Sequence, residues 1–236
     1  MNDQYVWLTW SLLFLVPWGI VFFLFPRFRT KIWKASLYTA PFGLTEPLFV
    51  PEYWNPPTLF DLAQRTGFDI ESLIFCFGIG GIAVVLYDLM NPHKAADLEQ
   101  HERSAKRHRF HRLILFSPFI IFTGLSFFSW NAIYPGIIAM LAGGVGTIWC
   151  RPDLFKRTGI GGAIFVAYYF IFLFGLEPLS PGYVARIWNL ENLSGISLLG
   201  FPIEEFLFAL GFGMYWSSVY EHIYWIQFDL WSTSYE

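Results

Sequence analysis

Long apolar runs separated by short groups of charged residues constrain this chain more than any other feature of its sequence. An α-helix needs about 20 mostly apolar residues to cross the hydrocarbon core of a bilayer. Only 14% of the 236 residues are charged and 55% are hydrophobic, whereas soluble domains are about 25% charged. The sequence therefore predicts an all-α polytopic membrane protein. Its seven candidate transmembrane helices cover roughly residues 5–25, 32–48, 69–90, 112–129, 132–150, 160–177 and 201–223.

The first two runs are irregular. The first follows Met1-Asn2-Asp3-Gln4, which lacks the basic residues of a signal peptide, and ends at Phe25-Pro26-Arg27 without a small-residue cleavage site. We therefore expect a retained span. Pro41 and Gly43 interrupt the second run, an irregularity that bilayers tolerate where neighbouring helices satisfy the freed backbone groups.

Lysine and arginine are divided unequally between the two sides of the predicted membrane. Cytoplasmic loops carry an excess of both residues. Of the 15 in the chain, only Arg65 and Arg186 fall on the side of the N-terminus. We therefore expect an inner (cytoplasmic) membrane protein with its N-terminus outside and its C-terminus in the cytoplasm. The residues on the cytoplasmic side are Arg27, Arg29, Lys31, Lys34, Lys94, Arg103, Lys106, Arg107, Arg109, Arg112, Arg151, Lys156 and Arg157.

The run from His93 to Arg112 is basic and rich in histidine. Binding of nucleic acid or of a metal could be argued from it. A cytoplasmic loop that faces anionic lipid headgroups is the interpretation we favour, because such residues are expected there. Cys76 and Cys150 lie in or beside apolar runs and are interpreted as packing residues. The sequence thus predicts no metal site and no nucleic-acid partner.

Two parts of the chain resemble each other. Residues 42–48 read Phe-Gly-Leu-Thr-Glu-Pro-Leu and residues 174–179 read Phe-Gly-Leu-Glu-Pro-Leu. Farther along, residues 67–75 pair with 200–208, and Trp54 and Trp188 fall between the two motifs in either copy. One alignment, with an offset of 133, also pairs Gly78 with Gly211, Gly80 with Gly213, Tyr87 with Tyr220 and Asp88 with Glu221.

This repeat predicts how the helices are organised. Spans one to three match spans five to seven, and the fourth span restores the same orientation to the second copy. We expect two parallel three-helix repeats joined by a linker helix, an arrangement of three plus one plus three. The expected units are residues 1–91, a basic cytoplasmic loop with the linker helix at 92–130, and residues 131–236.

Four glutamates lie within or at the ends of apolar runs on one side of the predicted membrane. A carboxylate in hydrocarbon costs several kcal/mol unless it is paired or protonated, so such a residue is a functional candidate. The simpler explanation for Glu71 and Glu204 is a first-turn acid that favours the helix dipole. Because lysine and arginine are nearly absent from this side, we expect the carboxyl groups to be protonated or to share protons. The four are Glu46, Glu71, Glu177 and Glu204.

Aromatic residues flank these acids, and most of the 27 Phe, 12 Tyr and 11 Trp of the chain are expected simply to face lipid. A proton donor set among aromatic faces nevertheless suits a carbocation reaction, because the acid protonates an alkene and the rings stabilise the cation. The candidate substrate-binding rings are Phe68, Phe75, Phe201, Phe206 and Phe208.

Residues 201–208, Phe-Pro-Ile-Glu-Glu-Phe-Leu-Phe, followed by Tyr220-Glu221, resemble the signature of the non-flavin, membrane-integral lycopene cyclases of the heterodimeric or fused bacterial, archaeal and fungal type. The resemblance extends over most of the chain through both repeats, although the first repeat carries Asp69 and Ser72 where the second carries Pro202 and Glu205.

The resemblance implies a carotenoid cyclase that converts the linear ψ ends of a lycopene-like substrate to β-ionone-type rings without redox change and without a cofactor. In class this would be an intramolecular lyase or isomerase. Its partners would be the linear carotenoid, the bilayer, and a second copy of the chain or other enzymes of carotenoid synthesis. We expect Glu204 to be the principal acid or base, so that Glu204→Gln abolishes cyclisation. The other candidate catalytic residues are Glu71, Glu205, Glu46 and Glu177.

Other protein classes are compatible with parts of the sequence. Gly78-Ile79-Gly80-Gly81-Ile82-Ala83 fits a dinucleotide-binding pattern but lies within an apolar span rather than between a strand and a helix, so its small residues are expected to let helices approach closely. A retinal protein would need a lysine within the last span, which has none. A small seven-helix transporter or a carotenoid-binding protein without enzymatic activity is the remaining alternative.

Overall fold

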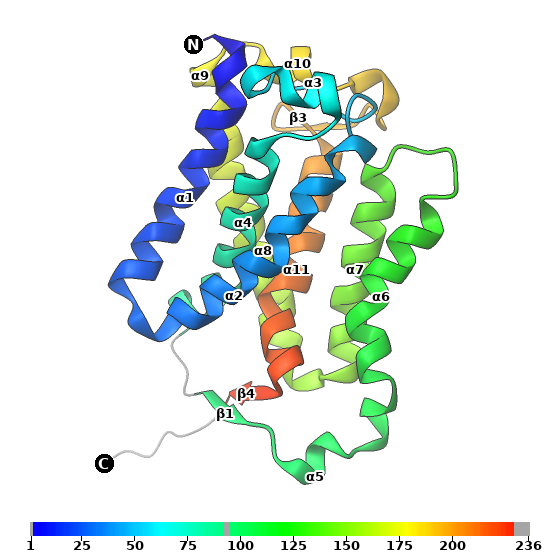
Figure 1. Ribbon diagram of the computed structural model, residues 1–236. Helices are drawn as coiled ribbons and strands as arrows, with labels where there is room; N and C mark the ends of the chain where they lie inside the picture. Colours follow the sequence, from blue (N-terminus) through cyan, green and yellow to red (C-terminus); the bar gives the residue numbers. More distant parts are fainter. Residues whose placement is uncertain (1, 92–94, 229–236) are drawn as a thin grey trace.

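The computed structural model describes residues 2–91 and 95–228, which are mostly helical (Figure 1). His93 and Lys94 of the predicted basic loop and the C-terminal residue Glu236 lie outside the described residues. The α-helices are α1 Val6–Leu24, α2 Arg29–Thr39, α3 Leu62–Thr66, α4 Ile70–Met90, α5 Gln100–Arg103, α6 His111–Leu125, α7 Ile133–Cys150, α8 Phe155–Phe174, α9 Leu176–Leu179, α10 Tyr183–Ile187 and α11 Ile203–Tyr224.

Short 3₁₀ segments and strand pairs complete the described chain. The 3₁₀ segments are η1 Asp3–Tyr5, η2 Pro26–Phe28, η3 Ala40–Leu48, η4 Leu59–Asp61, η5 Lys106–Phe110, η6 Pro152–Leu154 and η7 Leu190–Asn192. Strand β1 Ala95–Asp97 pairs antiparallel with β4 Ile226–Phe228, and β2 Ser197–Leu198 with β3 Phe201–Pro202. The all-α prediction is therefore correct apart from these two small ladders.

Helix occurs in each of the seven segments predicted to span the bilayer. Within residues 2–91 and 95–228, four helical segments are long and apolar enough to do so: Asp3–Leu24, Ile70–Met90, Ile133–Cys150 and Pro152–Leu179. Large apolar side chains such as Phe23, Phe127 and Ile171 are more than two-thirds exposed. Such helices are apolar on their outer faces too, as in a protein solvated by lipid. Helices α2 and α6 are shorter, at 11 and 15 residues, so the count of seven spans stays a prediction.

The second predicted span does not remain a regular α-helix. It begins as α2 and continues as the 3₁₀ segment η3, which contains Pro41 and Pro47. Proline has no N–H and cannot continue an α-helical ladder. A Cβ on Gly43 would lie 2.6 Å from the backbone nitrogen of Leu73, so only glycine lets η3 lie this close to α4. The close approach brings Glu46, one turn farther along, toward the centre of the molecule.

Helices α1, α4, α7 and α11 run in the same direction, from the end of the molecule that holds α3 and α10 to the end that holds β1 and β4 (Figure 1). We call these the upper and the lower end. Helix α4 packs on α1 and α2, and α11 packs on α7 and α8. We call α1, α2 and α4 the first triplet and α7, α8 and α11 the second. The two triplets have the same internal arrangement, and α4 meets α11 between them.

Matching glycines form matching contacts in the two triplets. A Cβ on Gly78 would lie 3.1 Å from Phe14 Cβ of α1, and one on Gly211 would lie 3.2 Å from Met140 Cβ of α7. Gly80 likewise packs against Thr39 of α2, and Gly213 against Phe165 and Gly162 of α8. These parallel contacts support the predicted repeat, and they agree with the expected role of the small residues in close helix packing.

Four charged residues meet near the lower end. Lys31 Nζ of α2 donates to Asp88 Oδ2 of α4 at 2.7 Å and also to Glu221 of α11. Arg157 of α8 donates to Asp88, and its Nη1 lies 3.4 Å from Glu221 Oε1. The sequence suggested loop positions for the two cations. The structure instead buries all four, and their charges balance because each triplet contributes one cation and one anion.

Candidate active site

An apolar cavity of about 320 Å³ lies between the two triplets. Aromatic side chains of α1, α4, α6, α8 and α11 line it, and the few polar groups among them include two glutamates, one from each half of the chain. Apolar pockets with a small number of placed polar groups are typical of sites for small molecules. Residues of the lining include Trp7, Trp10, Phe42, Glu46, Phe49, Tyr53, Trp54, Phe75, Phe119, Met140, Tyr169, Trp188, Glu205, Phe208 and Trp216.

Glu205, in the first turn of α11, is 2% exposed and lies among hydrogen-bond donors. Its Oε1 accepts from Trp188 Nε1 at 2.7 Å and from the Tyr53 hydroxyl, and its Oε2 accepts from Tyr169 Oη at 2.8 Å. Burial and the nearby Glu205 raise the pKa of Tyr53 well above its ordinary value, so this phenol keeps its proton and remains a donor. Three neutral donors favour the ionised form of the carboxyl group.

Glu46, on η3, supplies the carboxyl group from the first half of the chain. It is 7% exposed, and its Oε1 accepts from Trp54 Nε1 at 2.8 Å. The residue of α4 that matches Glu205 by the repeat offset is Ser72, which also lines the cavity. Ser72 interacts with Asp69, which caps α4 by accepting from the Ser72 backbone N–H at 2.5 Å. Each half therefore brings one carboxyl group to the cavity, but from different elements.

Two tryptophans connect these carboxyl groups. Trp54 and Trp188 form an antiparallel β-bridge, in which Asn55 N donates to Ile187 O at 2.8 Å and Asn189 N donates to Tyr53 O at 2.9 Å. Their ring centroids are 5.4 Å apart. The indole N–H of Trp54 is bonded to Glu46 and that of Trp188 to Glu205. The bridge therefore fixes the two glutamates relative to each other.

Glu71 and Glu204 are fully buried but do not line the cavity. Each accepts a hydrogen bond from the loop that precedes its own helix: Glu71 Oε1 from Leu59 N at 2.7 Å, and Glu204 Oε1 from Ser194 N at 2.9 Å. Glu204 also accepts from Tyr134 Oη at 2.7 Å. These matching bonds hold the upper loops against α4 and α11, so both residues support the site from its edge.

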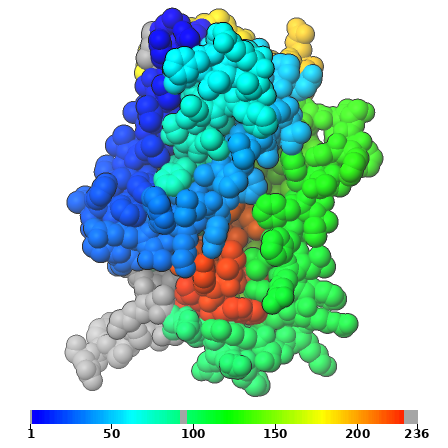
Figure 2. Space-filling model, in the orientation of Figure 1, coloured from blue at the N-terminus to red at the C-terminus, as the bar shows by residue number. Residues whose placement is uncertain are grey.

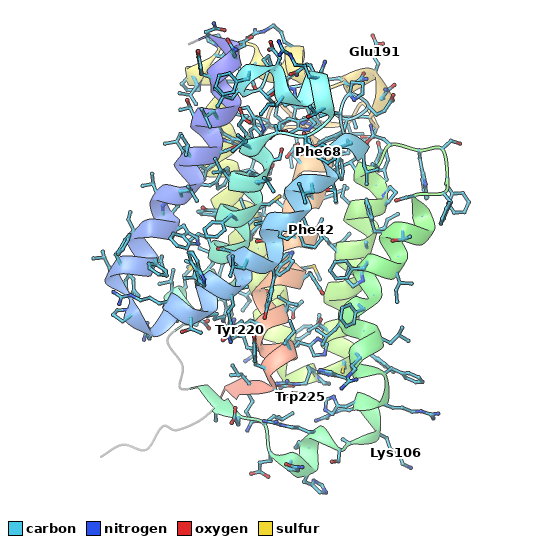
Figure 3. The ribbon with its side chains drawn as sticks, in the orientation of Figure 1. Phe42, Phe68, Lys106, Glu191, Tyr220 and Trp225 are labelled. Carbon is cyan, nitrogen blue, oxygen red and sulfur yellow. The ribbon has the colours of Figure 1, made fainter. Side chains whose placement is uncertain are left out.

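The remaining predicted residues divide between the cavity and its surroundings. Glu177 is exposed and accepts from Gly182 N at 2.7 Å in the upper loops. Phe75 and Phe208 line the cavity. Phe201 and Phe206 pack instead against Phe170 of α8, and Phe68 is exposed at the upper end, as Figure 3 shows.

Sequence reasoning missed most of the polar and aromatic groups around the two acids. Tyr53, Tyr169 and Trp188 bind Glu205 directly, and Trp7 and Trp10 form part of the wall together with Phe75, whose ring stacks on Trp10 at 5.5 Å. One signal was available, since Trp54 and Trp188 occupy corresponding places between the repeated motifs.

The fold and the site define a helical membrane protein with paired carboxyl groups in a buried aromatic cavity. The lycopene cyclase family model matches residues 131–223, so this part of the chain is similar to that family. The match covers α7, α8 and α11 and includes Glu205 and Glu204. Searches of curated proteins and of solved structures returned no match. This similarity supports an enzyme of carotenoid cyclisation that associates with a membrane.

Proposed function

We propose that the protein cyclises the linear ψ ends of a lycopene-like carotenoid to β-ionone-type rings, with Glu46 and Glu205 as the groups that handle protons. The observation that carries this proposal is the pair of buried carboxyl groups on one aromatic cavity, linked through Trp54 and Trp188. The first half of the chain, outside the family match, thereby supplies part of the same site. We also propose that the two triplets are the parallel repeats of a three-plus-one-plus-three protein.

The two environments suggest different roles for the acids. Glu46 is the better proton donor, because it has fewer donors around it and can carry the proton that adds to the terminal double bond. The tertiary cation is then attacked by a second double bond of the same chain, which closes the ring. Glu205, which accepts hydrogen bonds from three donors, stabilises the cation as a carboxylate and accepts the proton that is finally lost. One proton enters and one leaves, so the reaction is an isomerisation that needs no redox cofactor.

The aromatic lining serves the same chemistry. Cations are attracted to the faces of tryptophan, tyrosine and phenylalanine rings. Trp7, Trp10 and Phe75 present such rings on the wall formed by the first triplet, and Phe208 and Trp216 do so on that of the second. The apolar lining also excludes water, which would otherwise capture the cation as an alcohol.

The test is expression in a lycopene-accumulating bacterium, with chromatography of the extracted pigments. Glu205→Gln and Glu46→Gln should each reduce cyclic product by about 100-fold or more, in line with the loss of a general acid or base. The control is Glu177→Gln, an exposed position outside the cavity, which should leave the product unchanged. Membrane insertion is checked by immunoblot. Full cyclisation by both cavity variants would remove these carboxyl groups from the mechanism.

A carrier without activity is the alternative that this experiment tests. Such a carrier would be purified with linear carotenoid bound. Cells that express the wild-type chain would then contain no cyclic pigment. The transporter has less support, because the cavity lining is dominated by aromatic and aliphatic side chains.

A further inference from the structure

Two histidines and a cysteine meet near the lower end, on three different elements. His108 lies on η5, His111 begins α6 and Cys150 ends α7. The Cys150 Sγ atom lies 3.4 Å from His108 Nδ1 and 3.6 Å from His111 Nδ1. One potential ligand atom from each residue falls within 4.8 Å of the other two, and all three residues are buried. None of them lines the carotenoid cavity.

The two sulfur–nitrogen separations suit a tetrahedral metal ion. Zinc binds thiolate sulfur at about 2.3 Å and imidazole nitrogen at about 2.0–2.1 Å, so a tetrahedral ion would hold one sulfur and one nitrogen about 3.6 Å apart. The two measured sulfur–nitrogen distances lie within about 0.2 Å of that value. Without a metal ion, in contrast, the Cys150 thiol has one proton and can donate it to only one of the two ring nitrogens at a time.

The surroundings are compatible with a cation although arginines lie nearby. Arg107 Nη2 is paired with Glu102 at 2.5 Å, and Arg151 with Asp153 at 2.6 Å. Each guanidinium thus has its own carboxylate, and a thiolate at Cys150 would add a negative charge at the site. Arg107 Nε also donates to His108 Nε2 at 3.3 Å. Metal binding through Nδ1 would place a proton on Nε2 and open this long contact, whereas the pairing with Glu102 would remain.

A further histidine lies next to the cluster. The ring of His222, on α11, has its centroid 4.4 Å from that of His111. Its Nε2 is buried without a hydrogen-bond partner in the described part of the chain, and its Nδ1 lies 3.4 Å from Thr147 Oγ1. A buried ring nitrogen without a partner is costly. It is available as a fourth ligand after side-chain rotation, or as a partner for a metal-bound water.

We propose that His108, His111 and Cys150 bind a zinc ion. A mixed set of nitrogen and sulfur ligands selects zinc over magnesium or calcium. The ion would hold the basic segment around η5 against the start of α6 and the end of α7. Because this segment follows the first triplet in the chain, the ion would attach it to the second triplet. This site is separate from the cavity and does not depend on the proposed cyclase reaction.

The test is metal analysis of the full-length protein purified in detergent from cells grown with added zinc. Wild-type protein should contain about one zinc per chain by mass spectrometry, and Cys150→Ser and His111→Asn should lose at least five-sixths of it. Two matched controls, Cys76→Ser and His101→Asn on the exposed face of α5, should retain the zinc. Wild-type protein without zinc after equilibration in a micromolar zinc buffer would overturn the proposal, as would equal losses in the controls.

A second measurement needs no variant and covers the case in which Cys150→Ser fails to fold. X-ray absorption at the zinc edge of the wild-type protein should show one sulfur and at least two nitrogen neighbours in the first coordination shell. A first shell without sulfur would exclude Cys150 as a ligand and refute the site.

Discussion

At the scale of single residues, the main result concerns two adjacent glutamates. Glu204 and Glu205 are neighbours in the first turn of α11, and their sequence motif does not distinguish them. Successive residues of a helix point about 100° apart. Glu205 therefore reaches the cavity while Glu204 reaches the upper loops. The sequence favoured Glu204 as the principal catalytic residue, whereas the geometry favours Glu205.

This difference predicts unequal effects of the same substitution. Glu204→Gln keeps a side-chain oxygen that can accept from Ser194 N and Tyr134 Oη, so cyclisation should fall by less than about 10-fold. Glu205→Gln should lose about 100-fold or more, because an amide neither ionises nor accepts the final proton. Pigment yields, normalised to protein in the membrane, make the comparison. Equal losses in the two variants would contradict the assignment.

At the scale of elements, the buried charges of α2, α4, α8 and α11 join the triplets at their lower ends. Removing one member of a buried charge network leaves an unpaired charge, at a cost of about 3–5 kcal/mol. Exposed pairs contribute about 0–1 kcal/mol. The network includes Lys31 and Glu221, and the exposed pair Arg65–Asp61, at 4.0 Å, is a natural control.

Lys31→Met should therefore lower the midpoint temperature of unfolding in detergent by several degrees, whereas Arg65→Met should leave it nearly unchanged. The double variant Lys31→Met/Glu221→Gln restores charge balance among the remaining groups and should recover part of the loss. Fluorescence-detected size exclusion after heating provides the measurement. A double variant less stable than the single one would show that charge balance is not what stabilises this region.

The contact between η3 and α6 beside the cavity is a second feature at this scale. Phe42 and Phe119 line the cavity from these two segments, with ring centroids 5.7 Å apart, and Phe119 is 42% exposed. Figure 2 shows atoms of α11, orange to red, at the surface between the blue of α2 and η3 and the green of α6 and α7. This is where we expect a lipid-soluble polyene to enter sideways from the bilayer.

Thr123 lines the cavity and is also exposed, so it lies on α6 where the cavity approaches the surface. Thr123→Trp should obstruct entry and reduce cyclisation at least 10-fold. The adjacent Gly124 has open space around it, and Gly124→Trp should have little effect. Both variants are measured by pigment yield at limiting lycopene. An unimpaired Thr123→Trp variant would mean that the substrate enters elsewhere.

At the scale of the whole molecule, the direction of the chain in the membrane is the main expectation. Glu191 and Lys106 lie at the upper and lower ends (Figure 3). In intact cells, an impermeant maleimide should label Glu191→Cys but should label Lys106→Cys only after permeabilisation, because the basic side is expected in the cytoplasm. The background consists of buried Cys150 and half-buried Cys76. The reverse labelling pattern would invert the predicted topology.

The sequence predicted most of the helical segments because each needs only a long apolar run, and it predicted the paired glycines because one offset aligned them. It did not predict the zinc candidate, since Cys150 follows His111 by 39 residues and only the packing of α6 on α7 brings them together. Nor could it place Tyr169 beside Glu205, 36 residues away on another helix. The local pattern of apolar residues in the sequence reveals individual helices, whereas a site built between helices depends on how they pack.

The size of the cavity has a consequence for the order of products. A volume of about 320 Å³ is near the lower limit of small-molecule pockets, and a linear carotenoid is far longer than such a space. One terminus can occupy the site while the remainder of the polyene extends into the bilayer. Modification of both termini would then require the molecule to leave, reverse and return. A time course should show the monocyclic pigment rising first and the bicyclic pigment following after a lag.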